Sequence, residues 1–219
     1  IKYDRSLRRI PRNALNPYID NFLLGSGLTM PGEEANVLST LEQMTRITKM
    51  GEGGIQSADA VTDEARAVQG DYLGFVDNIQ GPESERIGID VRAAHKTYLG
   101  KDNKLYGEFT NLRTGKTEYI PIDKATDGIV AFPGQDPKAK VLDVIKDGVP
   151  QRVPREEVTY MVPSFAHSVA SNINMNPMPT AVQAGRQFYG AKFWSQYLPQ
   201  VKGEVPLVNR HSLSIMVVK

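Results

Sequence analysis

The chain has 219 residues, 40% of them hydrophobic, and its 26 basic residues nearly balance its 25 acidic ones. This length and composition suffice for one domain with an apolar core, and no run approaches the ~18 apolar residues that suggest a membrane helix. Because cysteine is absent, disulfides and thiolate metal sites are excluded, and an intracellular setting is mildly favoured. A net charge of +1 disfavours a free-standing nucleic-acid-binding module, which usually carries a clear basic excess.

The first quarter of the chain is expected to hold an arm and a helix. Residues 1–20 are basic and contain two prolines, which predicts an arm or linker. A helix is predicted to begin near Glu33 or Glu34, where acidic side chains suit the positive end of the helix dipole. The helical spacing continues to Gly51, which is well placed as the C-terminal cap. Because the chain begins at Ile1, we expect either a processed product or part of a longer polypeptide.

A β-rich stretch follows, and a second helix comes near the end. Residues 105–111 and 117–122 flank the turn Arg113–Lys116, a pattern typical of a hairpin. Further strands are predicted at 129–132, 141–145, 158–162 and 213–218, with a Pro- and Gly-rich loop at 133–140. A helix is predicted from about residue 181 to residue 197. The period of 3.6 residues per turn places four side chains on one face of it: Arg186, Tyr189, Phe193 and Gln196.

Three features suggest chemistry but have simpler structural explanations. The turn Gly51–Gly54 lacks the Lys-Ser/Thr of a P-loop and follows a helix instead of preceding one, so a structural turn is favoured over a phosphate cradle. The three histidines are widely separated, which makes a zinc site improbable. Glu83 belongs to a group of turn carboxylates whose default interpretation is a solvated surface.

Arg186 and Gln196 are the more informative pair. A guanidinium among aromatic residues on a helix face can simply stack or extend to solvent. It can also clamp a phosphate, because its forked donors carry a permanent charge. Taken alone, the residue pattern favours the structural interpretation, since long basic side chains usually lie at surfaces.

Three sequence blocks occur in order along the chain. The first contains Asn36, Leu38, Ser39, Arg46, Ile47, Gly51, Gly53, Gly54 and Ile55. The second contains Arg66, Val68, Gly74, Val76, Ile79, Pro82, Glu83, Ile87, Gly88 and Ile89. The third contains Val158–Met161, Ser164, Ser171, Arg186, Gly190, Ala191, Gln196 and Pro199. In this order and register, the blocks resemble the β subunit of multi-subunit DNA-dependent RNA polymerases over about residues 22–208.

The chain also departs from the pattern of that family. Gln43 replaces a histidine, Ser84–Arg86 replace a Gly-Pro-Asn sequence, and Lys192 replaces an asparagine. Such divergence looks like the polymerases of large bacteriophages, in which β is often split into separate chains. The resemblance therefore implies a divergent, split β subunit from a large bacteriophage.

The resemblance also implies a fold. We expect an α+β structure that contains the fork region and part of the β-subunit double-psi β-barrel, completed by partner chains. The expected organisation is a basic arm or linker at 1–20, a fork-loop region at 21–95, a β-rich hairpin insertion at 96–157, and the barrel-associated strand and helix of the active-centre wall at 158–219.

By resemblance, the chain forms one wall of a polymerase active centre and carries no catalytic residue by itself. Arg186 would bind the phosphates of the incoming nucleotide, and Gln196 would contact RNA near its growing end. Glu83 would lie near the downstream edge of the active site. Arg46 would order the fork helix or touch the RNA–DNA hybrid, and Lys49 is a weaker candidate for phosphate contact.

The partners follow from the same resemblance. We expect other β-type and β′-type subunits, the DNA template, nascent RNA and nucleoside triphosphates, with no membrane. Mg²⁺, which nucleotidyl transfer needs, would be bound by a β′-type partner chain. The expected location is the cytoplasm of a bacterial host, with packaging in the virion as a further option. The alternative function is a phage structural protein with no catalytic role, which would assemble with itself.

Overall fold

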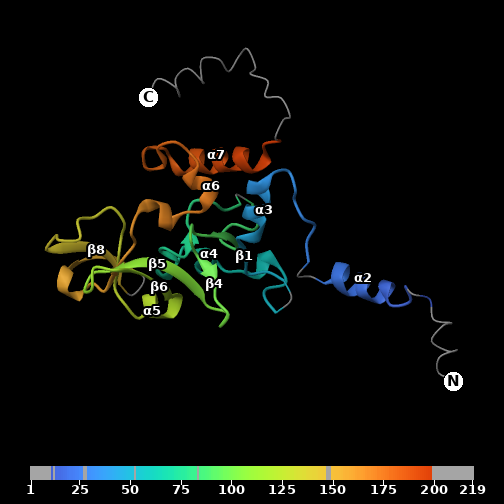
Figure 1. The fold of residues 1–219 in the computed structure, drawn as a ribbon, viewed down its shortest axis with the longest axis horizontal. Coiled ribbons are helices and arrows are strands. Elements are labelled where there is room, and N and C mark those ends of the chain that lie inside the picture. The colour runs from blue at the N-terminus through green and yellow to red at the C-terminus, as the bar shows by residue number, and fades with distance from the viewer. Residues whose placement is uncertain are drawn as a thin grey trace, which may run out of the picture.

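The computed structural model describes residues 11, 13–26, 29–51, 53–82, 84–146 and 149–198, and all structural statements concern these residues. They form an α+β structure in which short helices surround two sheets (Figure 1). The α-helices are α2 (Asn16–Gly25), α3 (Val37–Met44), α4 (Asp63–Arg66), α5 (Ile122–Thr126), α6 (Ser171–Asn174) and α7 (Ala184–Gln196). Short 3-10 helices are η1 (Ala58–Ala60), η2 (Gly70–Tyr72), η3 (Arg155–Glu157), η4 (Phe165–Ser168) and η5 (Pro179–Ala181).

The first helix of the body is shorter than the sequence predicts. Helix α3 begins after Asn36, whose side chain accepts the backbone N–H of Ser39 in a capping box, and not at the acidic pair upstream. It ends at Met44, because the next residues form strand β1 (Arg46–Thr48). The predicted continuation to Gly51 is therefore wrong. β-branched residues in this stretch favour a strand, and a distant strand is available to pair with it.

That distant strand builds the smaller sheet. It is antiparallel and has the order β1-β3-β2, with β2 at Val76–Asp77 and β3 at Asp90–Ala93. The register places Ile47 of β1 opposite Val91 of β3. Pairing across this distance in sequence holds the 46–50 segment against the 84–93 segment.

The larger sheet has seven strands. Its strands are β4 (Tyr98–Leu99), β5 (Leu105–Asn111), β6 (Thr117–Pro121), β7 (Val130–Ala131), β8 (Val141–Lys146), β9 (Val149–Pro154) and β10 (Tyr160–Met161). Their order is β4-β5-β10-β7-β8-β9, and β6 pairs with β5. The predicted hairpin at 105–122 is confirmed, as are the strands predicted near 130, 143 and 160. Within the described residues neither sheet closes into a barrel.

Strand β10 connects distant parts of the chain. It pairs antiparallel with β5 and parallel with β7, so residues 160–161 lie in the interior of the sheet built mainly by residues 98–154. Beneath this sheet, Phe75 and Phe109 are fully buried with ring centroids 5.1 Å apart. Burying two such rings supplies a large apolar contribution to the core.

Helix α2 stands apart from the body in Figure 1 and has no buried residue. It begins within the segment expected to be an arm, because Pro17 lies in its first turn, where a missing N–H costs nothing. Every helix in the described ranges is too short or too polar to span a bilayer. Most of the predicted arm and the strand predicted at 213–218 lie outside the described residues.

Candidate nucleotide and nucleic-acid site

Helix α7 carries Arg186 and Gln196 on one face, as the sequence predicts, and the structure exposes that face to solvent. Both side chains are exposed, and so are those of Tyr189 and Phe193, which lie between them on that face. Its opposite face is buried and consists of Gln187, Ala191 and Ser195. The predicted helix at 181–197 is confirmed, although its first regular turn begins at Ala184.

Buried polar contacts hold α7 in place. The amide nitrogen of Gln187 donates to the carbonyls of Pro179 and Val182, which ties the loop before the helix to its first turn. From the neighbouring segment, Asn176 Nδ2 donates to the carbonyl of Gln187 over 2.8 Å. Because both amide side chains are buried, these bonds exchange little with water and restrict the helix position. The side chain of Arg186 therefore projects from a firmly held helix.

Asn36 joins α3 to the C-terminal end of α7. While its Oδ1 caps α3, its Nδ2 donates to the carbonyls of Trp194 and Tyr197 over 2.9 Å and 2.6 Å. The last carbonyls of a helix have no intrahelical partner, so this amide satisfies two groups that would otherwise need solvent. In Figure 1, α3 and α6 lie along the same side of α7. Sequence reasoning used Asn36 only as a motif match and missed this role.

Arg46 lies on β1 and not on a helix, and its guanidinium is already paired. It forms a salt bridge with Asp90 of β3, to which Thr48 Oγ1 also donates over 2.6 Å. Arg86 adds a second cation 3.5 Å from the same carboxylate. Burial acts to raise the pKa of Asp90, but the Thr48 hydrogen bond and the two cations outweigh it and hold the pKa below its ordinary value of 3.8.

Lys49 is also engaged with its own chain. Its Nζ donates to the carbonyl of Ala65 over 2.6 Å, and the ammonium lies 5.9 Å from the centre of the Tyr72 ring. Its role in phosphate contact stays a prediction, as does the role of Arg46 at the hybrid.

Glu83 lies outside the described residues, but the loop that follows it is well defined. The guanidinium of Arg66 donates to the carbonyls of Glu85 and Ile87 in this loop. It also donates to the carbonyls of Ala58 and Val61, and the four distances range from 2.6 Å to 3.3 Å. Gly88 has φ +68°, and a Cβ at this position would lie 2.1 Å from the carbonyl oxygen of Arg66. Only glycine permits this close approach. Arg66 thus fixes the loop after Glu83, a role that sequence reasoning missed.

A groove of about 1000 Å³ lies beside Arg46. It is lined by Asn21, Phe22, Gly25, Ser26, Thr29, Met30, Gln43, Arg46, Thr48, Met50, Gly51, Gln56 and Arg86. The groove brings Arg46 and Arg86 together, and none of its lining residues comes from α7. The structure therefore separates the predicted site residues into two groups. Arg46 and Lys49 form the β1 group, and Arg186 and Gln196 form the α7 group. Helix α3 connects the two groups.

Comparison with known proteins gives these groups a context. A family model described as RNA polymerase Rpb2, domain 3, matches residues 32–98. "DNA-directed RNA polymerase subunit beta" of Mycoplasma mycoides is 28% identical over 205 residues, covering 89% of this chain. The proteins of the same name from Thermotoga petrophila and Solidesulfovibrio magneticus are 25% and 24% identical, covering 87% and 95% of the chain. The chain is β-subunit-like.

This β-subunit-like chain spans 16% of the length of each of these relatives. The family model includes Asn36, Arg46 and Lys49, whereas Arg186 and Gln196 lie beyond its end. The hydrogen bonds from Asn36 to α7 therefore connect the part that matches the family model to the helix that carries the predicted nucleotide contact.

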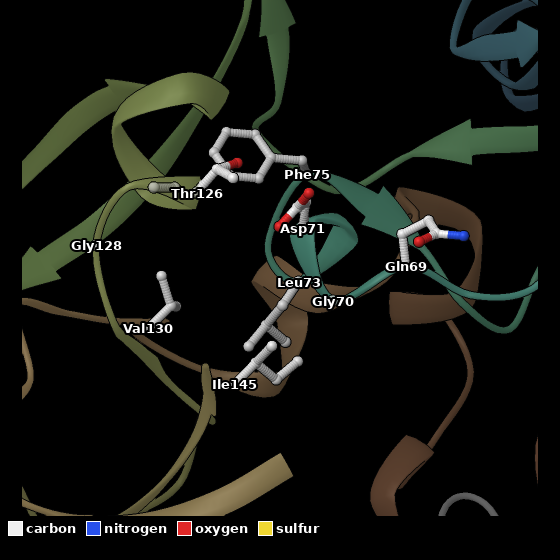
Figure 2. A pocket seen from close by; sticks show the side chains of 10 residues that line it. Gln69, Gly70, Asp71, Leu73, Phe75, Thr126, Gly128, Val130 and Ile145 are labelled. Atoms are coloured by element: carbon white, nitrogen blue, oxygen red, sulfur yellow. The ribbon is translucent and has the colours of Figure 1, made fainter. Parts of the chain in front are cut away.

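Two further features of the β-subunit-like chain lie away from the predicted residues. A pocket of about 260 Å³ between the η2 segment and the α5–β7 connection is lined mostly by apolar and small residues, together with Gln69, Asp71 and Thr126 (Figure 2). The rings of His95 and His167 lie 6.4 Å apart, and His167 bridges Ser164 and Glu108. Across the described ranges, no group of three or more His, Cys, Asp or Glu side chains is arranged to hold a metal ion.

Proposed function

We propose that this chain forms one wall of the active centre of a multi-subunit DNA-directed RNA polymerase, a nucleotidyltransferase. The observation that most directly supports this proposal is the pair of hydrogen bonds from Asn36 to the end of α7. Asn36 lies inside the segment that matches the polymerase family model. Through these bonds, helix α7, whose exposed face carries Arg186 and Gln196, is held against the segment that matches the family model. In this proposal, Arg186 binds the phosphates of the incoming nucleotide, and Gln196 contacts RNA near its growing end.

The chemistry of α7 supports the role of Arg186. The helix carries Arg186 and Lys192 but no carboxylate among its 13 residues. Within the described part of the chain, Arg186 forms no ion pair, whereas Arg46 and Arg86 share Asp90. An unpaired guanidinium keeps its five donors and its full charge for an anion. The triphosphate of a nucleotide is such an anion, and positioned cations stabilise the charge that develops on it during transfer.

The β1 group has a supporting role in this proposal. The Arg46–Asp90 pair orders β1 against the loop at 84–90, and Arg66 fixes that loop from the other side. Glu83 immediately precedes this loop and is proposed to lie near the downstream edge of the active site. Arg46 retains 22% exposure, so its free edge is proposed to face the RNA–DNA hybrid, with Lys49 as a weaker contact.

The described residues do not fit a catalytic metal, so no step through a metal is assigned to this chain. In the proposed assembly, Mg²⁺ is bound by a β′-type partner chain and stabilises the attacking and leaving oxygens there. Other β-type subunits complete the double-psi barrel, and the DNA template and nascent RNA pass along the wall.

The origin of the chain is also part of the proposal. The departures at Gln43, Ser84–Arg86 and Lys192 favour a split β subunit of a large bacteriophage that acts in the cytoplasm of a bacterial host. We propose packaging in the virion as a second location. Co-purification tests the assembly: a polymerase segment is recovered with other β-type and β′-type chains, and a virion structural protein is recovered as an assembly of itself.

The role of Arg186 is tested in the assembled polymerase. Arg186→Ala should lower kcat/KM for nucleotides by about 10- to 100-fold, since a hydrogen bond to a charged group contributes roughly 1.5–3 kcal/mol. Arg186→Lys should recover part of this loss, because it keeps the charge without the forked donors. Arg113→Ala, at an exposed position in the β5–β6 turn, is the matched control. Normal elongation by an assembled Arg186→Ala polymerase would contradict the assignment.

A further inference from the structure

The exposed face of α7 combines aromatic rings with cations. Phe193 and Tyr189 are 73% and 46% exposed, although large aromatic side chains are usually well buried. Arg186 and Lys192 are both exposed, and the helical period places them at the two edges of the face that carries these rings. The neighbouring groove of about 590 Å³ between α3 and α7 is different, because its lining combines an aromatic ring, Trp194, with a carboxylate, Glu34.

The spacing along the helix places the two rings one above the other. Tyr189 and Phe193 are four residues apart, so their Cβ atoms lie about 5–6 Å from each other on the same face. The ring of Tyr189 also contacts that of Phe188, with centroids 5.7 Å apart, which restricts its orientation. Two rings at successive turns form a short row of apolar surfaces that point away from the protein core.

The charges around this row decide which partner it fits. No carboxylate is present on α7, and within the described residues neither Arg186 nor Lys192 is paired with one. A polyanion with flat apolar surfaces complements both the cations and the rings. Single-stranded nucleic acid is such a partner, because its bases are free to stack on aromatic side chains while its phosphates meet the cations. In a duplex the bases are stacked inside the helix, so no free base face is available to the aromatic rings.

We infer that this face of α7 binds single-stranded nucleic acid, with Tyr189 and Phe193 stacking on successive bases and Lys192 contacting the backbone. The inference rests on the proposed function, which it deepens by adding three residues and a mode of binding to the wall of the active centre. Gln196, at the C-terminal end of the same face, then marks the end of the row.

The test is the affinity of the full chain, with whichever partner chains co-purify, for a fluorescein-labelled ten-nucleotide oligouridylate, measured by fluorescence anisotropy without nucleoside triphosphates. Phe193→Ala and Tyr189→Ala should each weaken binding about tenfold, as expected for the loss of one base–aromatic stack. Phe193→Trp should retain binding, whereas Phe193→Leu should lose as much as Phe193→Ala. Lys192→Gln should reduce the slope of log K against log salt by about 0.7, the value for one phosphate on a single strand.

Val37→Ala is the matched control, because Val37 is 84% exposed on α3, outside the proposed face, and its substitution should leave binding unchanged. Since Phe193 is largely exposed, its substitution should leave the fold intact, which circular dichroism verifies. Wild-type affinity of Phe193→Leu would overturn stacking, because leucine offers apolar surface without an aromatic ring. Equal affinity for a duplex, or no binding at low salt, would also overturn the inference.

These results are separable from the test of the proposed function. If oligonucleotide binding is unaffected by the ring substitutions while Arg186→Ala still slows elongation, the proposed function stands and this inference fails. If the rings govern binding while Arg186→Ala elongates normally, the reverse holds.

Discussion

Substituting Gly190 by alanine should loosen α7, the helix that carries the proposed nucleotide contact. An alanine Cβ at this position would lie 2.5 Å from Asn176 Oδ1 and 3.0 Å from its Cγ. Contacts this short do not persist, so the Asn176 side chain must move. Its movement would break the 2.8 Å hydrogen bond to the carbonyl of Gln187 and open the packing between α6 and α7.

The expected cost follows from three opposing contributions. Forcing an extra methyl group into a packed contact costs about 1–3 kcal/mol, and a lost hydrogen bond costs about 0.5–1.5 kcal/mol. Replacing a helical glycine by alanine contributes about 1 kcal/mol in the other direction. The net expectation for Gly190→Ala is a fall of about 0.5–3.5 kcal/mol in the free energy of unfolding.

Gly185 offers a matched control in the same helix. No atom lies within 4 Å of an alanine Cβ at Gly185, so only the conformational preference should act there. Gly185→Ala should therefore raise the free energy of unfolding by roughly 0.5–1 kcal/mol. The two substitutions are chemically identical, so their opposite signs isolate the contact with Asn176.

Urea unfolding followed by tryptophan fluorescence suits this measurement, because the single tryptophan, Trp194, lies within α7. Circular dichroism at the same urea concentrations shows whether the helix and the rest of the chain unfold together. If Gly190→Ala stabilises the protein as much as Gly185→Ala does, Asn176 does not press against α7, and the reasoning is refuted. A double variant that adds Asn176→Ala should recover most of the packing cost of Gly190→Ala.

Two further substitutions test the contacts that hold β1 and the loop at 84–90. Asp90→Asn should lower the free energy of unfolding by about 1–3 kcal/mol at neutral pH, because it leaves Arg46 without its carboxylate. Because the pKa of folded Asp90 lies below its ordinary value of 3.8, the difference from wild type should be fully present above about pH 5 and be lost as the pH falls through the lowered pKa of the folded state. Urea titrations at several pH values measure it, and a difference that stays constant as the pH is lowered would exclude the ion pair as its cause. Arg66→Ala should remove the bonds to Glu85 and Ile87 and increase amide hydrogen exchange across residues 84–90, and Arg66→Lys should restore little, because one ammonium cannot reach carbonyls on both sides. Unchanged exchange in both Arg66 variants would show that the loop is held by other contacts.

Local patterns were enough to predict several elements and one face of the site. The β5–β6 hairpin follows from two alternating runs around a Gly-containing turn. The shared face of Arg186 and Gln196 on α7 follows from helical periodicity alone, which places them together whatever the helix packs against. Local sequence decided these features because the interactions that define them span only a few residues.

Other features depended on partners far away in the chain. Strand β1 forms because it pairs with β3, with Ile47 opposite Val91. This pairing overrides the helical spacing of side chains that continues past Met44. Arg46 is neutralised by Asp90 for the same reason. Strand β10 enters the sheet between β5 and β7, a position that no local signal indicates.

The sequence by itself therefore determined which side chains share a face of α7 and, through the order of three blocks, the resemblance to RNA polymerase β subunits; that this face is exposed was decided by the tertiary structure. Only the tertiary structure decided which cations remain unpaired. Arg46 meets a carboxylate across the small sheet, whereas Arg186 meets none among the described residues, although both are arginines in matching motifs. The reason is physical: a guanidinium binds the nearest fixed anion, and the fold determines which anion that is.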